Sequence, residues 1–118
     1  MDDEPTVLFA MSEYLTVRGF RVDTAAELEE ALALIAHIDY SAVIADLRLT
    51  GTTNTEGLEV VAAVRERSPG TRIVLHSGYG SPELEREALS RNVDVVLHKP
   101  TPMARIVDCL TRLLGGAL

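Results

Sequence analysis

The sequence predicts an α/β domain built on an open, parallel sheet with helices on both of its faces. Segments with strand-like composition alternate with helix-like segments along nearly the whole chain. The apolar runs at residues 43–45 and 73–75 show no polar alternation, which is typical of strands that helices cover on both faces. A length of 118 residues and 47% hydrophobic residues suit one domain that spans residues 1–118.

The first third of the chain predicts helix, strand and helix. Pro5 and apolar residues at near-helical spacing indicate a helix over residues 5–18, which ends at Gly19. Apolar alternation with a period of two predicts a short strand over residues 20–24. Residues 25–36 are rich in Ala, Leu and Glu, with acidic residues early, and predict a second helix.

From residue 40 onward, strands and helices alternate regularly. Loop composition is confined to residues 50–55. The predicted strands cover residues 40–46, 71–77 and 93–98, and the predicted helices cover residues 56–67, 82–92 and 102–114. His76 and His98 each precede a polar strand-end residue, so they could be cross-strand partners on one face. The favoured interpretation is packing under helices, and a metal-binding or pH-sensing pair is the alternative.

The predicted helices outnumber the predicted strands by five to four, because the chain opens on a helix. The acidic pair Asp2 and Asp3 stands where the turn after a first strand is expected, yet only Met1 precedes it. Either the sequence starts inside a longer protein or from a misplaced start, or the strand is truly lacking. In the second case, unpaired strand edges would favour domain swapping, dimerisation or aggregation.

Composition and charge exclude several kinds of partner. A formal net charge of −7 argues against direct binding of nucleic acid, which depends on clustered Lys and Arg. No apolar run approaches the ~20 residues that a membrane-spanning helix needs. Cys109 is the single cysteine and the chain opens without a secretory signal, so we expect a cytoplasmic protein.

Three predicted strands end on a reactive polar side chain: Asp46, Ser77 and Lys99. The carboxyl ends of parallel strands form the ligand crevice of an open sheet, so these side chains should converge there with Asp2 and Asp3. Carboxylates, a hydroxyl and an ammonium in one crevice suit Mg²⁺-assisted chemistry on a phosphoryl group.

The order of these residues resembles the receiver domain of bacterial two-component response regulators. The resemblance rests on Asp2-Asp3-Glu4-Pro5, Asp46-Leu47, Gly57-Leu58, Ser77-Gly78 and Lys99-Pro100. It implies a flavodoxin-like doubly wound sheet with strand order 2-1-3-4-5, in which the central first strand would be the missing one. It also implies a cis peptide bond before Pro100.

The resemblance further implies roles for the strand-end residues. Asp46 would accept a phosphoryl group from a sensor histidine kinase or a phosphotransfer protein, so the domain would be a switch rather than a turnover enzyme. Lys99 would pair with the phosphate and Ser77 would hydrogen-bond a phosphoryl oxygen. The expected ligands of Mg²⁺ are Asp2, Asp3, Asp46 and the backbone carbonyl of Arg48. By analogy, the last helices would form a homodimer.

Departures from the family pattern keep two alternatives open. Thr50 replaces a usual proline, Gly57 follows Asp46 by eleven residues instead of eight, and Val96 replaces a usual aromatic residue. These changes favour a pseudo-receiver that signals through protein contact alone. The second alternative is a small phosphatase or another flavodoxin-like enzyme, although no separate general acid or base is evident.

Overall fold

The computed structural model describes residues 1–2, 4–47, 56–77 and 82–115. Asp3, Arg48 and Thr50 therefore lie outside the described residues. The elements follow the chain in the order α1 (Pro5–Val17), α2 (Leu28–His37), β1 (Ala42–Leu47), α3 (Glu56–Arg67), β2 (Arg72–Ser77), α4 (Pro82–Ser90), β3 (Val95–His98) and α5 (Met103–Leu113).

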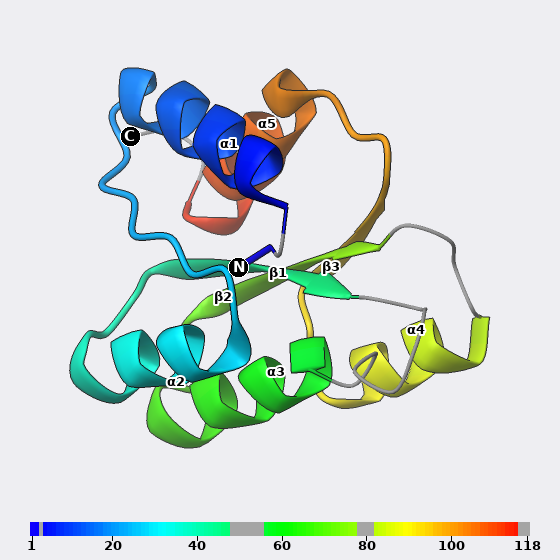
Figure 1. Ribbon diagram of the computed structural model, residues 1–118. Coiled ribbons are helices and arrows are strands. Elements are labelled where there is room, and N and C mark those ends of the chain that lie inside the picture. Colours follow the sequence, from blue (N-terminus) through cyan, green and yellow to red (C-terminus); the bar gives the residue numbers. More distant parts are fainter. Residues whose placement is uncertain (3, 48–55, 78–81, 116–118) are drawn as a thin grey trace.

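The described strands form one parallel sheet in the order β1-β2-β3, which confirms the predicted α/β class. Helices α1 and α5 lie on one face of the sheet, and α2, α3 and α4 lie on the other (Figure 1). Two apolar cores result, one on each face. Ile73 and Leu75 belong to the core with α2, α3 and α4, whereas Val74 between them belongs to the core with α1 and α5. Burial on both faces explains why three successive middle residues of β2, Ile73, Val74 and Leu75, are all apolar.

Burial of the strand side chains is nearly complete in the middle of the sheet. Ala45, Ile73 and Leu75 are fully buried, and each large apolar side chain there stabilises the fold by about 1.5–3 kcal/mol. Helix α5 contributes Ile106 and Leu110, four residues apart, to the core on its face. The sheet is therefore a rigid platform for the side chains at the ends of its strands.

The strand predicted over residues 20–24 is wrong, because these described residues belong to no helix or strand. A strand is defined by its backbone hydrogen bonds to a neighbouring strand. The residues that lie beside this segment are Met1 and Asp2. The Asp2 amide donates to the Ala25 carbonyl at 3.1 Å. The helix predicted from residue 25 instead begins at Leu28, since Glu27 before it has extended backbone angles.

Met1 and Asp2 lie between this segment and β1. The Met1 ammonium donates to the Ile44 carbonyl at 2.6 Å, and the Asp46 amide donates to the Met1 carbonyl at 2.9 Å. The absence of a first strand, expected from the sequence, remains a prediction. The cis Lys99-Pro100 bond is confirmed. In the described part of the chain, no helix has the length and apolar character that crossing a bilayer requires.

At the opposite end of the sheet, Arg65 and Asp94 form a compact ion cluster. The Arg65 guanidinium lies 3.1 Å from the Asp94 carboxylate, and both side chains are less than one-fifth exposed. Asp94 also accepts from the Ile73 amide at 2.7 Å and contacts Arg72 at 3.3 Å. Arg65 further donates to the backbone carbonyls of Pro69, Thr71 and Asn92. This cluster ties the start of β2 and β3 to α3.

Candidate functional site

The fold brings Asp2, Asp46 and Lys99 together at the carboxyl end of the sheet, although they lie far apart in the sequence. Asp46 is near the end of β1, Lys99 directly follows β3, and Asp2 lies beside β1 at the chain start. Asp2 is 4% exposed and Asp46 is 5% exposed. Two buried carboxylates in one place require a partner cation, because an uncompensated buried charge is costly.

Lys99 supplies that cation. Its Nζ atom lies 2.9 Å from Oδ1 of Asp46 and 3.3 Å from Oδ2 of Asp2. The Lys99 amide donates to the Ser77 carbonyl at 2.6 Å, which fixes the backbone from which the side chain extends. The Lys99 side chain remains 25% exposed, so the site is accessible from solvent on the lysine side.

The carboxylates keep Lys99 protonated. Burial by itself would lower the pKa of Lys99, but the hydrogen bond and negative charge of Asp46, followed by those of Asp2, outweigh burial and raise it. The ammonium is therefore a fixed positive charge at neutral pH. A fixed cation beside a buried carboxylate is suited to hold an anionic group that arrives at that carboxylate.

Backbone contacts position Asp2. Its Oδ1 accepts from the Glu4 amide at 3.0 Å, while its Oδ2 faces Lys99. Its own amide is bound to the carbonyl of Ala25. Burial lowers the pKa of the adjacent Met1 ammonium, against the opposing charges of Asp2 and Asp46. The position of Asp2 thus depends on how the first two residues pair with their neighbours.

Ser77 lies at the same end of the sheet but does not join the carboxylate and lysine contacts. Its side chain is fully buried, and its Oγ atom has no hydrogen-bond partner among the described residues. Its carbonyl accepts from the Lys99 amide. A buried hydroxyl without a partner is free to donate to a group that enters the site.

His76 is a polar residue beside the site, for which the sequence favours a packing role over a metal-binding or pH-sensing one. It pairs in register with Asp46, so both side chains project from the same face of the sheet. Its ring is buried, and neither ring nitrogen has a hydrogen-bond partner within the described residues. Burial, then the charge of Lys99, lower the pKa of His76 against the opposing effect of Asp2. The imidazole is therefore neutral above its lowered pKa.

The predicted pairing of His76 with His98 is wrong. The register places His76 opposite Leu97 and Ser77 opposite His98, so the two histidines project from opposite faces. Strand alternation is visible in the sequence, but the relative register of two strands is not. One feature of the sequence could have placed His76 beside the site: it directly precedes Ser77, the last residue of a strand that ends at the site.

Two of the expected Mg²⁺ ligands, Asp2 and Asp46, lie close together in the described part of the chain. Asp2 and Asp46 direct carboxylate oxygens at one ammonium, and such oxygens are the ligands that Mg²⁺ prefers. Among the side chains of Asp2, Asp46 and Lys99, one negative charge is in excess. The described residues contain no group of three or more His, Cys, Asp or Glu that could hold a metal. The remaining expected ligands, Asp3 and the Arg48 carbonyl, lie outside the described residues.

Comparison with known proteins gives one consistent family. The family model of the response regulator receiver domain matches residues 1–111. The photosynthetic apparatus regulatory protein RegA of Rhodobacter capsulatus is 31% identical over 110 residues, which are 93% of this chain. The alignment spans 58% of RegA, so the chain corresponds to little more than half of that relative.

Solved structures agree with the family match. A CheY-like response regulator receiver domain protein from Methanospirillum hungatei superposes with a TM-score of 0.87 at 25% identity, over 96% of this chain and 88% of that one. A response regulator from Burkholderia pseudomallei, with a phosphorylated aspartic acid, a calcium ion and citrate, has a TM-score of 0.82 at 28% identity, over 92% and 62% of the two chains. Taken with the parallel sheet and the cluster at its carboxyl end, these matches show that the chain belongs to the response regulator receiver domain family.

Proposed function

We propose that this receiver domain is a phosphorylation-controlled switch in which Asp46 accepts a phosphoryl group from a sensor histidine kinase or a phosphotransfer protein. The observation that carries the proposal is the contact of one ammonium with two buried carboxylates, from Lys99 to Asp46 and Asp2. Such a cluster supplies a nucleophile and a fixed cation within contact distance of each other.

Each side chain has a distinct role in this proposal. Asp46 attacks the phosphorus atom through a carboxylate oxygen, the bond from phosphorus to the donor breaks, and an acyl phosphate forms on Asp46. Lys99 neutralises part of the phosphoryl charge, and the buried Ser77 hydroxyl donates to a phosphoryl oxygen. Asp2 contacts Lys99 and carries no bond to the phosphoryl group.

A divalent cation completes the charge balance at the site. The excess negative charge of Asp2 and Asp46 over Lys99 would repel an incoming phosphoryl donor. Mg²⁺, held by Asp2, Asp46 and by Asp3 and the Arg48 carbonyl as the family resemblance implies, would neutralise charge on the phosphoryl oxygens. The phosphorylated aspartic acid and calcium ion of the Burkholderia pseudomallei relative support this combination of groups. We place the reaction in the cytoplasm, since the chain has a single cysteine.

A contact-only signalling module is the second candidate, and one observation favours it. Val96 belongs to the half-buried side chains packed against the core of α2, α3 and α4, where the family usually has an aromatic residue. A small aliphatic side chain there has no large rotation with which to report a chemical change at Asp46. The two candidates differ in whether Asp46 takes up a phosphoryl group.

Intact mass after incubation with acetyl phosphate and Mg²⁺ separates these candidates. We expect the unmodified sequence to gain one phosphoryl group, Asp46→Ala to gain none, and Asp108→Ala to behave as the unmodified sequence. Asp108 is an exposed aspartate of α5 and therefore a matched control. Circular dichroism confirms that each variant is folded. Absence of a mass gain in the folded, unmodified sequence would support the contact-only module instead.

A further inference from the structure

The Lys99 side chain reaches Asp46 across a strand that lies between them. Asp46 is on β1, Lys99 directly follows β3, and β2 lies between these two strands in the sheet. Neighbouring strands are about 4.8 Å apart, so β1 and β3 are separated by about twice that distance. The Lys99 Nζ atom is nevertheless only 2.9 Å from Oδ1 of Asp46. The lysine side chain therefore extends over the carboxyl end of β2.

The strand register shows which residue of β2 lies along this path. Asp46 pairs with His76, and His76 pairs with Leu97. The Lys99 amide donates to the Ser77 carbonyl, which continues the ladder one residue beyond β3. Alternation directs Lys99 to the face of Leu97, which is also the face of His76. Ser77 projects from the other face, so His76 is the last residue of β2 on the face of the lysine.

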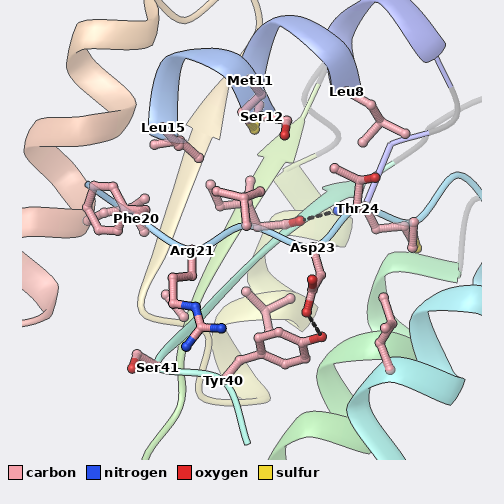
Figure 2. Close-up of a pocket in the computed structure, with 18 of the residues that line it drawn as sticks. Leu8, Met11, Ser12, Leu15, Phe20, Arg21, Asp23, Thr24, Tyr40 and Ser41 are labelled. Carbon is pink, nitrogen blue, oxygen red and sulfur yellow. Dashed lines mark hydrogen bonds between the residues drawn. The ribbon is translucent and has the colours of Figure 1, made fainter. Parts of the chain in front are cut away.

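Helices α1 and α5 cover this face of the sheet (Figure 1). Val74, two residues before His76, packs with Leu15 of α1 and Ile106 of α5 in one apolar core. Figure 2 shows Leu15 and other side chains of α1 directed toward the sheet. His76 continues the row of Val74 toward the charged site and is only 6% exposed. The ring is therefore enclosed between an apolar core and the charged site.

Both ring nitrogens of His76 are buried, and neither has a hydrogen-bond partner in the described part of the chain. A neutral imidazole has one N–H donor and one acceptor nitrogen. The Lys99 ammonium has three N–H groups, and its partners among the described side chains are the carboxylates of Asp46 and Asp2. An acceptor nitrogen and a third ammonium proton are thus left on the same face of the sheet. Buried polar atoms without partners are rare in folded proteins and require an explanation.

The two side chains also influence each other through charge. Burial is the main cause that lowers the pKa of His76, and the charge of Lys99 is the second. The ring is therefore neutral at pH 7. A neutral ring does not repel the ammonium, and its acceptor nitrogen attracts it.

Phosphoryl transfer changes what the ammonium contacts. As Asp46 forms its bond to phosphorus, the negative charge of its carboxylate passes to the phosphoryl oxygens, so Asp46 binds the ammonium less strongly. Lys99 must then stay at the end of β2 to neutralise the phosphoryl charge. An additional acceptor at this place keeps the ammonium in position while its contact with Asp46 weakens.

We propose that His76 is a positioning residue for Lys99 in phosphoryl transfer. Its ring lies beneath the Lys99 side chain, and its acceptor nitrogen accepts a hydrogen bond from the ammonium as Asp46 loses its carboxylate charge. No proton is transferred in this step. The inference rests on the proposed function, since it assigns His76 a part in the phosphorylation of Asp46.

The first test compares the rates of phosphoryl incorporation from saturating acetyl phosphate with Mg²⁺. His76→Leu removes the acceptor and should slow incorporation about tenfold, the effect of one hydrogen bond. His76→Gln retains an acceptor oxygen and should stay within about threefold of the unmodified sequence. Val74→Ala removes buried atoms from the same face of β2 and should lose stability but keep its rate within about twofold. Circular dichroism confirms that each variant is folded.

A double-mutant cycle distinguishes positioning of Lys99 from a general effect on the fold. In the Lys99→Met background, His76→Leu should change the rate by less than about twofold, because the partner of His76 is already absent. An equal loss in both backgrounds would show that His76 supports the fold rather than Lys99, and would overturn the proposal. A rate for His76→Leu within about twofold of the unmodified sequence would overturn it too.

The ¹⁵N NMR spectrum of the His76 ring tests the hydrogen bond without phosphorylation. Asp46→Asn removes the carboxylate charge, so the acceptor nitrogen should bind the ammonium and its resonance should move upfield. The resonance should stay in place when Lys99→Met is added to Asp46→Asn. A resonance that does not move, or that moves equally with and without Lys99, would contradict the proposal. If the unmodified sequence gains no phosphoryl group, the proposed function fails, and the ring resonance alone decides whether His76 positions Lys99.

Discussion

Both ends of the sheet carry a cluster of buried or partly buried charges, and the clusters differ in which groups contact those charges. At the amino end, Arg65 pairs with Asp94 and also donates to three backbone carbonyls, while Asp94 accepts from a backbone amide and a second arginine. At the carboxyl end, Lys99 contacts the carboxylates of Asp2 and Asp46, and one negative charge is in excess. The first cluster joins elements of the fold. In the second cluster, the excess negative charge can bind a cation, and the Lys99 ammonium can contact an incoming anion.

The comparison shows why a buried ion pair alone does not identify a functional site. In a structural ion pair, backbone groups form the hydrogen bonds that the two charged side chains do not make with each other. A buried charge is stable only when all its hydrogen-bonding atoms have partners. A site that binds a charged group must keep part of that capacity for its ligand. The two clusters should therefore respond differently to the same substitution.

The largest expected effect is on phosphoryl incorporation in Lys99→Met. Removal of the fixed cation should slow incorporation from acetyl phosphate on the order of 10²–10³-fold, the usual effect of removing a group that stabilises developing charge. Arg65→Met makes a similar change in charge at the other end of the sheet and should leave the rate within about twofold, measured where both variants are folded. An equal loss of rate in both variants would contradict the division of roles between the clusters.

The second effect is on stability and should be found in Arg65→Met. This variant leaves the partly buried Asp94 with Arg72 as its remaining cation and removes hydrogen bonds to backbone carbonyls, so it should lose about 2–3 kcal/mol of unfolding free energy. Urea denaturation measures the loss. Arg91→Met, which breaks an exposed pair with Glu87 on α4, is the matched control and should lose less than about 0.5 kcal/mol. Equal losses would show that the Arg65 cluster does not hold the fold.

The third effect is a pH dependence of stability due to His76. The folded pKa of His76 lies below its ordinary value of 6.5, so below about pH 6.5 the unfolded chain binds more protons than the folded chain. Stability should therefore fall as the pH decreases below 6.5, by at most about 1.4 kcal/mol per pH unit from this one group. Urea denaturation at several pH values should give a flatter profile for His76→Leu than for His37→Gln, a change at the exposed end of α2. Parallel profiles for the two variants would exclude His76 as the source.

The smallest effect concerns the hydrogen bond that the Tyr40 hydroxyl donates to Asp23. Burial, then the hydrogen bond to Asp23 and its charge, raise the pKa of Tyr40 to about 12. The bond stabilises the fold below pH 10 and this contribution is lost as the pH rises through about 12. Tyr40→Phe should cost about 0.5–1 kcal/mol at pH 7, and ultraviolet titration should show a lower Tyr40 pKa in Asp23→Asn. An unchanged titration would show that Asp23 does not set the pKa.

The sequence predicts the parts of the fold that depend on local pattern. The uninterrupted apolar runs of β1 and β2 identify buried parallel strands, and their last polar residues lead to Asp46 and Ser77. The roles of Asp2, Asp3, Asp46, Ser77 and Lys99 and of the Arg48 carbonyl remain predictions that phosphorylation experiments will test. The proximity of Asp2, Asp46 and Lys99 is now a structural observation.

The features that the sequence does not predict depend on contacts between segments that are distant in the chain. Residues 20–24 alternate like a strand, yet a strand needs a ladder of backbone hydrogen bonds, and the Asp2 amide donates to Ala25, one residue beyond this segment. The register of β2 and β3, which separates His76 from His98, is set by packing across the whole sheet. Arg65 acts mainly through backbone carbonyls, which every residue has and which leave no pattern in the sequence.

The most direct test of the central claim is to locate the phosphoryl group in the chain. Borohydride reduces an acyl phosphate of aspartate to homoserine, so peptide mass spectrometry after treatment with acetyl phosphate, Mg²⁺ and borohydride identifies the modified residue. The account predicts homoserine at residue 46, in the peptide that contains β1, and at no other aspartate. Modification of another residue, or an unmodified Asp46 in a folded protein, would contradict the claim that Asp46 is the phosphoacceptor.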